Sequence, residues 1–214
     1  MIKKNLGTLI LTTVILLLPM VIGLMMWNKL PDQVPMHWNI SGEVDGWGSK
    51  GMLVFVFPLL FVGIEWLGFL ATAHDFSRKG FSKRPLQLVL WICPCLSLLI
   101  HTLIYAKILG YDPAVDIVTP LVMGLGFIVV GNLLPKCKRN RTVGIKLPWT
   151  LNNDDNWNKT HRLAGKLWVV GGAIIAATAV LGTLVISFVV LLAMVMIPTV
   201  YSYLYFCKQK KEGN

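Results

Sequence analysis

Long apolar runs separated by short polar segments dominate the chain. The runs cover residues 6–27, 52–73, 86–106, 117–134 and 163–207. Each of the first four is close to the roughly 20 apolar residues that one helix needs to cross the hydrocarbon core of a bilayer. The last run is too long for one crossing and suits two helices with a tight turn near Gly182 and Thr183. The pattern therefore predicts an all-α integral membrane protein with six transmembrane helices.

Composition and charge agree with this interpretation. Of the 214 residues, 55% are hydrophobic and 14% are charged, and the mean hydropathy is +0.66. Soluble domains carry about 25% charged residues. The formal net charge of +10 could indicate a nucleic-acid partner, but the basic residues cluster at the ends of the apolar runs, as membrane topology requires. We therefore expect the lipid bilayer and its anionic headgroups as a partner, with no direct contact to nucleic acid.

The distribution of Lys and Arg predicts the orientation of the helices. Cytoplasmic loops of membrane proteins carry an excess of these residues. If the N-terminus is cytoplasmic, all of the 20 basic residues except Lys29, Lys50 and Lys107 fall on the cytoplasmic side. We therefore expect both termini in the cytoplasm and a small extracytoplasmic cap after the first helix.

The predicted cap is the polar segment "PDQVPMHWNISGEVDGWGSKG", residues 31–51. Its two prolines restrict the backbone to an extended entry. "MHWN" could form a short strand, and "SGEVDG" is typical of paired turns in which Gly42 and Gly46 adopt positive φ. The predicted result is a compact cap that presents four side chains to the solvent: His37, Trp38, Asn39 and Asp45.

Two other interpretations of the cap remain open from the sequence. Trp38 and Trp47 are common residue types at a membrane interface and could simply seat the segment on the bilayer. A metal site needs three or four converging ligands, and only His37, Glu43 and Asp45 are candidates. We therefore predict no bound metal and no cofactor.

A second polar segment, residues 136–168, lies on the predicted cytoplasmic side. Its first part is basic and should lie against anionic headgroups. "VGIKLPW" alternates apolar and polar residues, and Pro148 disfavours a helix before it, which predicts an extended backbone. Asn152 or Asn153 can cap a following helix, with Asp154 and Asp155 favourably placed in its first turn. A plain solvated loop is the alternative, but such a connector needs only a few polar residues.

Two ionisable residues fall inside predicted transmembrane helices. Glu65 is in the cytoplasmic half of the second helix, and His101 is in the extracytoplasmic half of the third. Intramembrane ionisable groups are candidates for function by default. Their depths differ by roughly 10 Å at about 1.5 Å per residue, so a direct pair is not expected. Glu65 is better placed for a charge pair with Arg162 or Lys166, and an ion-coupled transporter that uses Glu65 and His101 is the alternative function.

The sequence contains no catalytic pattern. Neither H-E-x-x-H, nor G-x-S-x-G, nor a glycine-rich phosphate loop occurs, so we expect no enzymatic activity. The four cysteines do not suggest a disulfide framework. Cys93 and Cys95 lie within an apolar run, and Cys137 and Cys207 flank predicted cytoplasmic helix ends.

The two polar segments resemble the modules of a known family. "LPDQVPMHWNISGEVDGWGSK" resembles the N-terminal module of the SdpI immunity-protein family, which reads P-x-x-[IV]-P-x-H-W-N-x-x-G-x-x-D. "GNLLPKCKRNRTVGIKLPWTLNNDDNWNKTHRLAGKLW" resembles the C-terminal module, which reads G-I-R-T-P-W-T-L and then W, T-H-R and G. The chain departs from the family where Lys146 and Leu147 replace Arg-Thr. Lys keeps the charge but loses the bidentate fork of Arg.

The resemblance implies a polytopic protein of the bacterial cytoplasmic membrane that protects the cell from a secreted antimicrobial peptide toxin. The family's best-known member is also a receptor that retains a cytoplasmic helix-turn-helix repressor at the membrane. The resemblance leaves the oligomeric state open. The expected modules are residues 1–73, with two helices and the cap, residues 74–116, with a linking loop and the third helix, and residues 117–214, with three helices and a cytoplasmic loop at 135–162.

The segments and the resemblance together define two groups of candidate residues. The extracytoplasmic candidates for toxin binding are His37, Trp38, Asn39, Gly42, Asp45 and Gly46. The cytoplasmic candidates for partner binding are Arg141, Gly144, Lys146, Pro148, Trp149, Thr150, Trp157, Thr160, His161 and Arg162.

Overall fold

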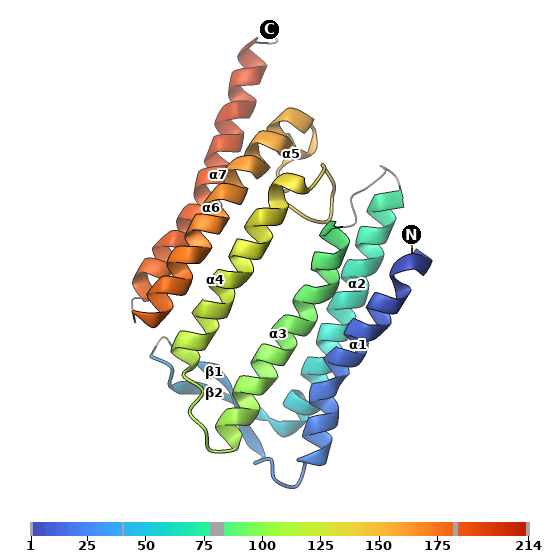
Figure 1. The fold of residues 1–214 in the computed structure, drawn as a ribbon, viewed down its shortest axis with the longest axis vertical. Helices are drawn as coiled ribbons and strands as arrows, with labels where there is room; N and C mark the ends of the chain where they lie inside the picture. Colours follow the sequence, from blue (N-terminus) through green and yellow to red (C-terminus); the bar gives the residue numbers. More distant parts are fainter. Residues whose placement is uncertain (1, 40, 78–83, 182–183, 213–214) are drawn as a thin grey trace. The chain divides into compact units, whose positions relative to one another are not determined.

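A computed structural model describes residues 2–39, 41–77, 84–181 and 184–212 of the chain. Its longest elements are six helices (Figure 1), which are α1 (Ile2–Met25), α2 (Phe57–Ser77), α3 (Arg84–Ile108), α4 (Val115–Leu133), α6 (Asp154–Val180) and α7 (Leu184–Glu212). The shorter elements are the strands β1 (Gln33–Trp38) and β2 (Val44–Ser49), the π-helix η1 (Met52–Val56), the 3-10 helix η2 (Leu134–Lys136) and the one-turn helix α5 (Pro148–Leu151).

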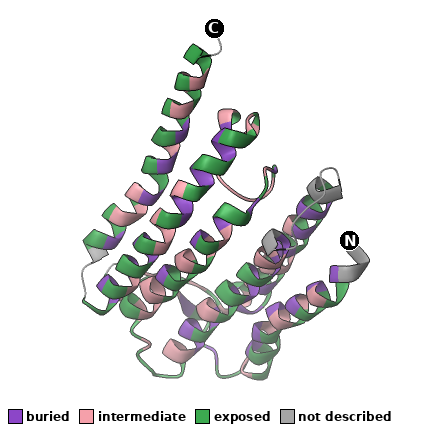
Figure 2. Cartoon of the chain, turned by 45° about the horizontal axis from the view of Figure 1, so that its top comes forward, coloured by how far each residue is buried: buried purple, intermediate pink, exposed green. Residues whose placement is uncertain are grey.

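The prediction of six transmembrane helices is confirmed for the residues that the structure describes. All six long helices are long and apolar enough to cross a bilayer. Many of their large apolar side chains are exposed, and exposed residues recur along each of these helices in Figure 2. In a membrane such side chains lie against acyl chains that are as apolar as they are, so their exposure is not destabilising.

Some helix ends differ from those that the apolar pattern predicts. α7 continues to Glu212, beyond the predicted end at Cys207. Its last turn is polar, with Lys208 Nζ 3.7 Å from Glu212 Oε1, and a polar turn is stable in water beyond the apolar core. The apolar pattern therefore predicts the part of the helix that crosses the membrane but not the polar turn that follows it. The predicted turn at Gly182 and Thr183 and the basic residues Arg78, Lys79 and Lys83 lie outside the described residues.

The chain divides into two compact units. The first comprises Met1–Ser77 and Leu86–Asp116, and the second comprises Arg78–Pro85 and Ile117–Asn214. The first unit therefore holds α1, both strands, η1, α2 and α3 beyond its first two residues. The second holds α4 beyond its first two residues, together with η2, α5, α6 and α7.

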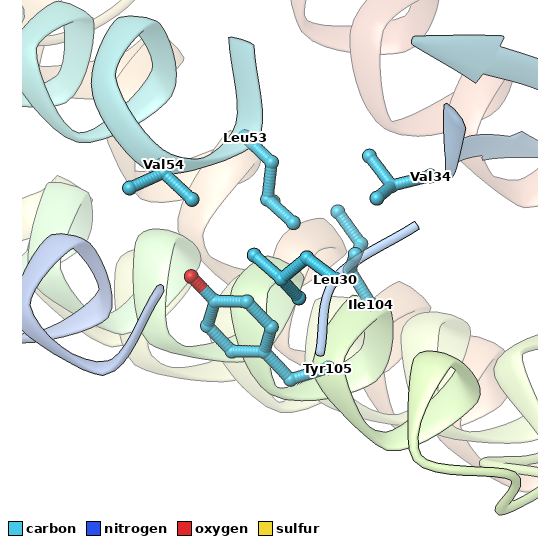
Figure 3. Close-up of a cluster of buried hydrophobic side chains, with 6 residues drawn as sticks. All are labelled: Leu30, Val34, Leu53, Val54, Ile104 and Tyr105. Carbon is cyan, nitrogen blue, oxygen red and sulfur yellow. The ribbon is translucent and has the colours of Figure 1, made fainter. Parts of the chain in front are cut away.

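An apolar core joins β1, η1 and α3 in the first unit. Figure 3 shows its buried side chains, which are Leu30, Val34, Leu53, Val54, Ile104 and Tyr105. The Tyr105 hydroxyl donates a hydrogen bond to the carbonyl oxygen of Pro19 in α1 at 2.8 Å. A Cβ at Gly23 of α1 would lie 2.6 Å from that hydroxyl and from a Val54 methyl. Glycine at this position therefore allows α1 to approach η1 and α3 closely.

Glycines also determine the helix packing of the second unit. A Cβ at Gly124 of α4 would lie 2.5 Å from the carbonyl oxygen of Gly172 in α6. About two turns further along α4, a Cβ at Gly131 would lie 2.9 Å from the carbonyl oxygen of Gly165 in α6. Small residues at both positions bring the two backbones together, which is how helices associate in a bilayer where burial of apolar side chains alone provides little driving force.

Candidate functional site

The strands β1 and β2 form an antiparallel hairpin, residues 33–49, which we call the hairpin. Its register pairs Pro35 with Trp47 and His37 with Gly46, with an irregularity on either side of His37. The predicted strand around "MHWN" is present in β1 as far as Trp38. The predicted turn at "VDG" is wrong, because Val44–Ser49 is the second strand.

The two glycines predicted to have positive φ behave differently. Gly42 has φ +76° and supplies the turn between the strands, as predicted. Gly46 is not among the described residues with positive φ, and that prediction is wrong. A Cβ at Gly46 would instead lie 2.8 Å from the Cβ of His37 on the neighbouring strand. Gly46 is therefore needed for the close approach across the strands and not for a turn.

Asn39 builds the turn of the hairpin. Its Oδ1 accepts hydrogen bonds from the backbone N–H groups of Ser41 at 2.9 Å and Glu43 at 3.0 Å. Its backbone N–H donates to the carbonyl oxygen of Glu43 at 2.8 Å. An Asn that bonds to the following backbone in this way stabilises a turn. Asn39 therefore has a structural role within the candidate site.

The hairpin presents a polar and aromatic face to its surroundings. The side chains of His37 and Asp45 are 72% and 45% exposed, and His37 Nδ1 lies 2.5 Å from Asp45 Oδ1. Trp47 is 61% exposed. Trp38 in contrast packs against the apolar core of the first unit. The structure thus brings His37 and Asp45 together on the surface, while Trp38 holds the hairpin in place.

Glu43 does not join the pair that His37 and Asp45 form. Its Oε2 accepts a hydrogen bond from the Asn39 amide at 3.3 Å. Among the described residues no group of three His, Cys, Asp or Glu side chains could hold a metal ion.

The second candidate region consists of residues 137–153 together with the N-terminal turns of α6 and the C-terminal turns of α7. We call it the platform. The Asn153 side chain accepts a hydrogen bond from the backbone N–H of Asn156 at 2.9 Å, so the predicted N-cap of this helix is confirmed at Asn153. Asp154 in the first turn forms an ion pair with Arg139, with 2.6 Å between Oδ1 and Nε. These contacts tie the loop to the start of α6.

His161 fixes the middle of the platform through its two ring nitrogens. Nδ1 donates to the carbonyl oxygen of Trp157 at 2.8 Å, and Nε2 accepts from the backbone N–H of Ile145 at 3.0 Å. These partners require the neutral ring with its proton on Nδ1. Gly144, with φ +123°, lies beside the ring, and a Cβ there would be 2.5 Å from Nε2. A side chain at position 144 would therefore collide with the His161 ring, which explains the glycine there.

Trp157 is the largest fully buried side chain of the platform, with no exposed surface. Its ring stacks on that of His161 at a centroid distance of 3.9 Å. Its Nε1 donates to the carbonyl oxygen of Cys137 at 2.8 Å, which anchors the beginning of the loop. Burial also raises the pKa of the Cys137 thiol, so this thiol stays protonated near neutral pH.

Hydrogen bonds of α5 and α6 to α7 complete the platform. Trp149 Nε1 donates to Ser202 Oγ at 2.8 Å, and Asn156 Nδ2 donates to the carbonyl oxygen of Ser202 at 2.9 Å. Thr160 Oγ1 donates to Asn156 Oδ1 at 3.0 Å. In α5, Thr150 Oγ1 accepts from the backbone N–H of Leu147 at 2.9 Å. Each of these polar groups therefore has a hydrogen-bond partner within the platform.

Burial separates the predicted partner-binding residues into two groups. Four are buried and hold the platform together, so they offer no side-chain surface to a partner: Thr150, Trp157, Thr160 and His161. Four others are exposed: Arg141, Lys146, Pro148 and Arg162. Gly144 and Trp149 are half-buried. The Lys146 ammonium donates to the carbonyl oxygen of Thr142 at 3.2 Å.

Sequence reasoning did not identify Asn140, Asn156 and Ser202. Asn140 is buried, and its Oδ1 accepts from the backbone N–H groups of Thr142 at 2.8 Å and Val143 at 2.6 Å. Asn156 directly precedes Trp157 on the buried side of α6, so the helical spacing of the buried residues could have indicated it. No local signal marks Asn140 or Ser202, because their partners are defined only by the folded loop.

Glu65 and His101 lie in separate hydrogen-bond groups of the first unit. Glu65 is fully buried, and its Oε2 accepts from Thr13 Oγ1 at 3.0 Å, while its Oε1 has no partner among the described residues. The nitrogen Nδ1 of His101 donates to the carbonyl oxygen of Ser97 at 2.7 Å. Pairing of Glu65 with Arg162 or Lys166 would join the two units and stays a prediction.

Comparisons with known proteins match both candidate regions. The SdpI/YfhL protein family matches residues 136–202, which contain most of the platform, and the Domain of unknown function (DUF1648) matches residues 14–62, which contain the hairpin. The chain is 28% identical to the Immunity protein SdpI of Bacillus subtilis (strain 168) over 215 residues, covering 96% of this chain and 97% of that protein. No solved structure matches. The chain is therefore similar to the SdpI/YfhL family over residues 136–202 and to Immunity protein SdpI along nearly its whole length, and it is a multi-pass protein of the cytoplasmic membrane.

Proposed function

We propose that this protein is a membrane immunity protein that protects the cell from a secreted antimicrobial peptide toxin. The observation that carries the proposal is the similarity to Immunity protein SdpI along nearly the whole chain. This similarity supports an immunity role, and it includes both the hairpin and the platform.

In this proposal the hairpin faces the outside of the cell and meets the toxin. The distribution of basic residues supports that orientation, because nearly all of them then lie in the cytoplasm. The surface pair of His37 and Asp45 and the exposed Trp47 offer charge, hydrogen bonding and aromatic area in one place. Aromatic residues surrounded by polar groups are typical of binding hot spots.

The platform is then cytoplasmic, and we propose it as the surface that retains a helix-turn-helix repressor. Its buried network supports this role, because it fixes a loop that could otherwise be a short flexible connector. The surface proposed for a repressor consists of the exposed Arg141, Lys146, Pro148 and Arg162 and the half-buried Trp149. Retention is measured by membrane fractionation of a tagged repressor in cells that produce either the unaltered protein or Arg162→Ala.

Cysteine labelling tests the proposed orientation. In a variant without the four native cysteines, Ser41→Cys should react with a membrane-impermeant maleimide in intact cells. Asn158→Cys, at an exposed position in the first turns of α6, should react only after the membrane is permeabilised. Both positions are exposed, so a difference in labelling reports the side of the membrane. Labelling of Asn158→Cys in intact cells contradicts the orientation.

Survival of toxin-treated cells tests the function itself. A Bacillus subtilis strain that lacks its own SdpI and is sensitive to the corresponding toxin should survive when it produces this protein. Growth no better than that of cells with an empty vector contradicts the proposal for this toxin.

The same survival assay tests a second candidate function, ion-coupled transport. The observation that favours transport is the buried Glu65, whose Oε1 has no partner among the described residues. Glu65→Gln should retain protection if immunity depends on the hairpin, and loss of protection at an equal protein level favours transport.

A further inference from the structure

A groove of about 430 Å³ lies at the end of the second unit where α5 meets the last turns of α7. Trp149, Asn152 and Asn153 line one side, and Phe206, Gln209 and Lys210 line the other. The groove is separate from the hairpin and is not lined by Lys146 or Arg162, but it shares Pro148 and Trp149 with the surface proposed above for a repressor.

The floor of the groove is aromatic and held in position. The rings of Trp149 and Phe206 stack with a centroid distance of 6.1 Å and an interplanar angle of 25°. The Ser202 hydroxyl accepts the Trp149 N–H at 2.8 Å. Asn153 Nδ2 donates to Gln209 Oε1 at 3.0 Å, which ties the two walls together. The groove is therefore a formed feature and not a gap between mobile side chains.

Two polar side chains of the groove remain available to a ligand. Neither the Asn152 amide nor the Lys210 ammonium has a hydrogen-bond or ion-pair partner among the residues that the structure describes. Both belong to exposed residues. The polar end of the groove therefore suits an anion that can accept hydrogen bonds.

The opposite end of the groove continues onto an apolar surface. Tyr203 lies one helical turn before Phe206 in α7, is 49% exposed, and contacts the Trp149 ring at a centroid distance of 5.3 Å. Val195, about three turns before Phe206 and on the same side of α7, is 58% exposed. These residues belong to the apolar stretch that crosses the membrane. The groove thus passes from a cationic end to a lipid-facing side of the helix.

We propose that this groove binds one anionic phospholipid, with its phosphate at Lys210 and Asn152 and an acyl chain along Tyr203 and Val195. In this arrangement Trp149 and Phe206 lie between the phosphate and the acyl chain. Aromatic rings are favoured at that level of a membrane interface. Charge complementarity selects an anionic headgroup, and the exposed apolar side chains of the same helix select a lipid in preference to a free phosphate or a soluble acidic peptide. The inference does not depend on the immunity function.

Native mass spectrometry of the purified full-length protein tests the inference. With phosphatidylglycerol and phosphatidylcholine of equal acyl chains, the protein should bind phosphatidylglycerol at least fivefold more tightly. Lys210→Gln should weaken phosphatidylglycerol binding about fivefold, as expected for one lysine at a charged lipid surface, and Asn152→Ala should also weaken it. The matched control is Lys211→Gln, which removes the same charge one residue later, outside the groove, and should change binding less than twofold.

Three outcomes would overturn the inference. Equal binding of both lipids would show that the groove does not select charge. Equal losses in Lys210→Gln and Lys211→Gln would show a general electrostatic attraction without a site. Displacement of bound phosphatidylglycerol by inorganic phosphate, or by a soluble poly-glutamate peptide at similar concentration, would show that the acyl chain contributes nothing and that the groove serves another anion.

Discussion

Gly124→Ala should leave little folded protein in the membrane, whereas Gly126→Ala in the same helix should be tolerated. A Cβ at Gly124 would lie 2.5 Å from the carbonyl oxygen of Gly172 and 2.7 Å from the backbone nitrogen of Ala176. Both atoms belong to the backbone of α6, so the contact can be relieved only by separating the helices. Overpacking of this kind costs about 1–3 kcal/mol, occasionally more, and here the loss of adjacent packing adds to it.

Gly126 provides the matched control, because a Cβ there meets nothing within 4 Å. Alanine favours a helix over glycine by about 1 kcal/mol, so Gly126→Ala should be neutral or slightly stabilising. The measurement is the membrane level and the thermal midpoint of each variant in the same detergent. Equal behaviour of Gly124→Ala and Gly126→Ala would contradict the close packing of α4 on α6.

Trp157→Ala should destabilise the platform by about 3–5 kcal/mol, the usual cost of replacing a buried Trp or Phe by Ala. The change removes a fully buried ring, the ring contact to His161 and the donor to the Cys137 carbonyl. Because Cys137 begins the loop, we also expect protease cleavage between residues 138 and 147 to accelerate. Limited proteolysis of the purified protein and its thermal midpoint measure the two effects.

Trp47→Ala is the control for this substitution, since Trp47 is 61% exposed and its removal leaves no comparable cavity. It should change the thermal midpoint little. If Trp157→Ala is no less stable than Trp47→Ala, the buried network is not what holds the platform, and the loop must be held mainly by its ion pairs.

The membrane crossings could be predicted from sequence because each depends on local composition. An apolar stretch of bilayer length is sufficient to define a spanning helix, and an N-cap at Asn152 or Asn153 follows from residue type and position. The structure places it at Asn153. The positive φ of Gly42 was predictable for the same reason, since a turn between two short strands commonly uses such a residue.

The errors concern contacts between residues that are distant along the chain. Gly46 is a glycine because His37 approaches it from the other strand, and sequence spacing alone does not give that register. The sequence also identified Trp157 and His161 as notable without showing that they are buried. Their environment depends on how residues 137–153 fold back over α6, which follows no helical or strand periodicity.

The same distinction applies to the motifs that carry the resemblance to the SdpI family. In the C-terminal module, the residues "W" and "T-H" correspond to Trp157, Thr160 and His161, and all three are buried. Their physical role in this chain is to fix the loop. In the N-terminal module, His37 is exposed and paired with Asp45. Its side chain, unlike those of the C-terminal motif, is free to contact another molecule on its exposed face.

The most direct test of the proposed role of the hairpin is the survival of toxin-treated cells that produce His37→Ala at the same membrane level as the unaltered protein. Loss of a binding hot spot weakens binding by at least about 2 kcal/mol, or roughly thirtyfold, so His37→Ala should be nearly as sensitive as cells with an empty vector. Gln33→Ala, at another exposed position of β1, should retain protection. Full protection by His37→Ala would contradict the proposal that the hairpin meets the toxin through this residue.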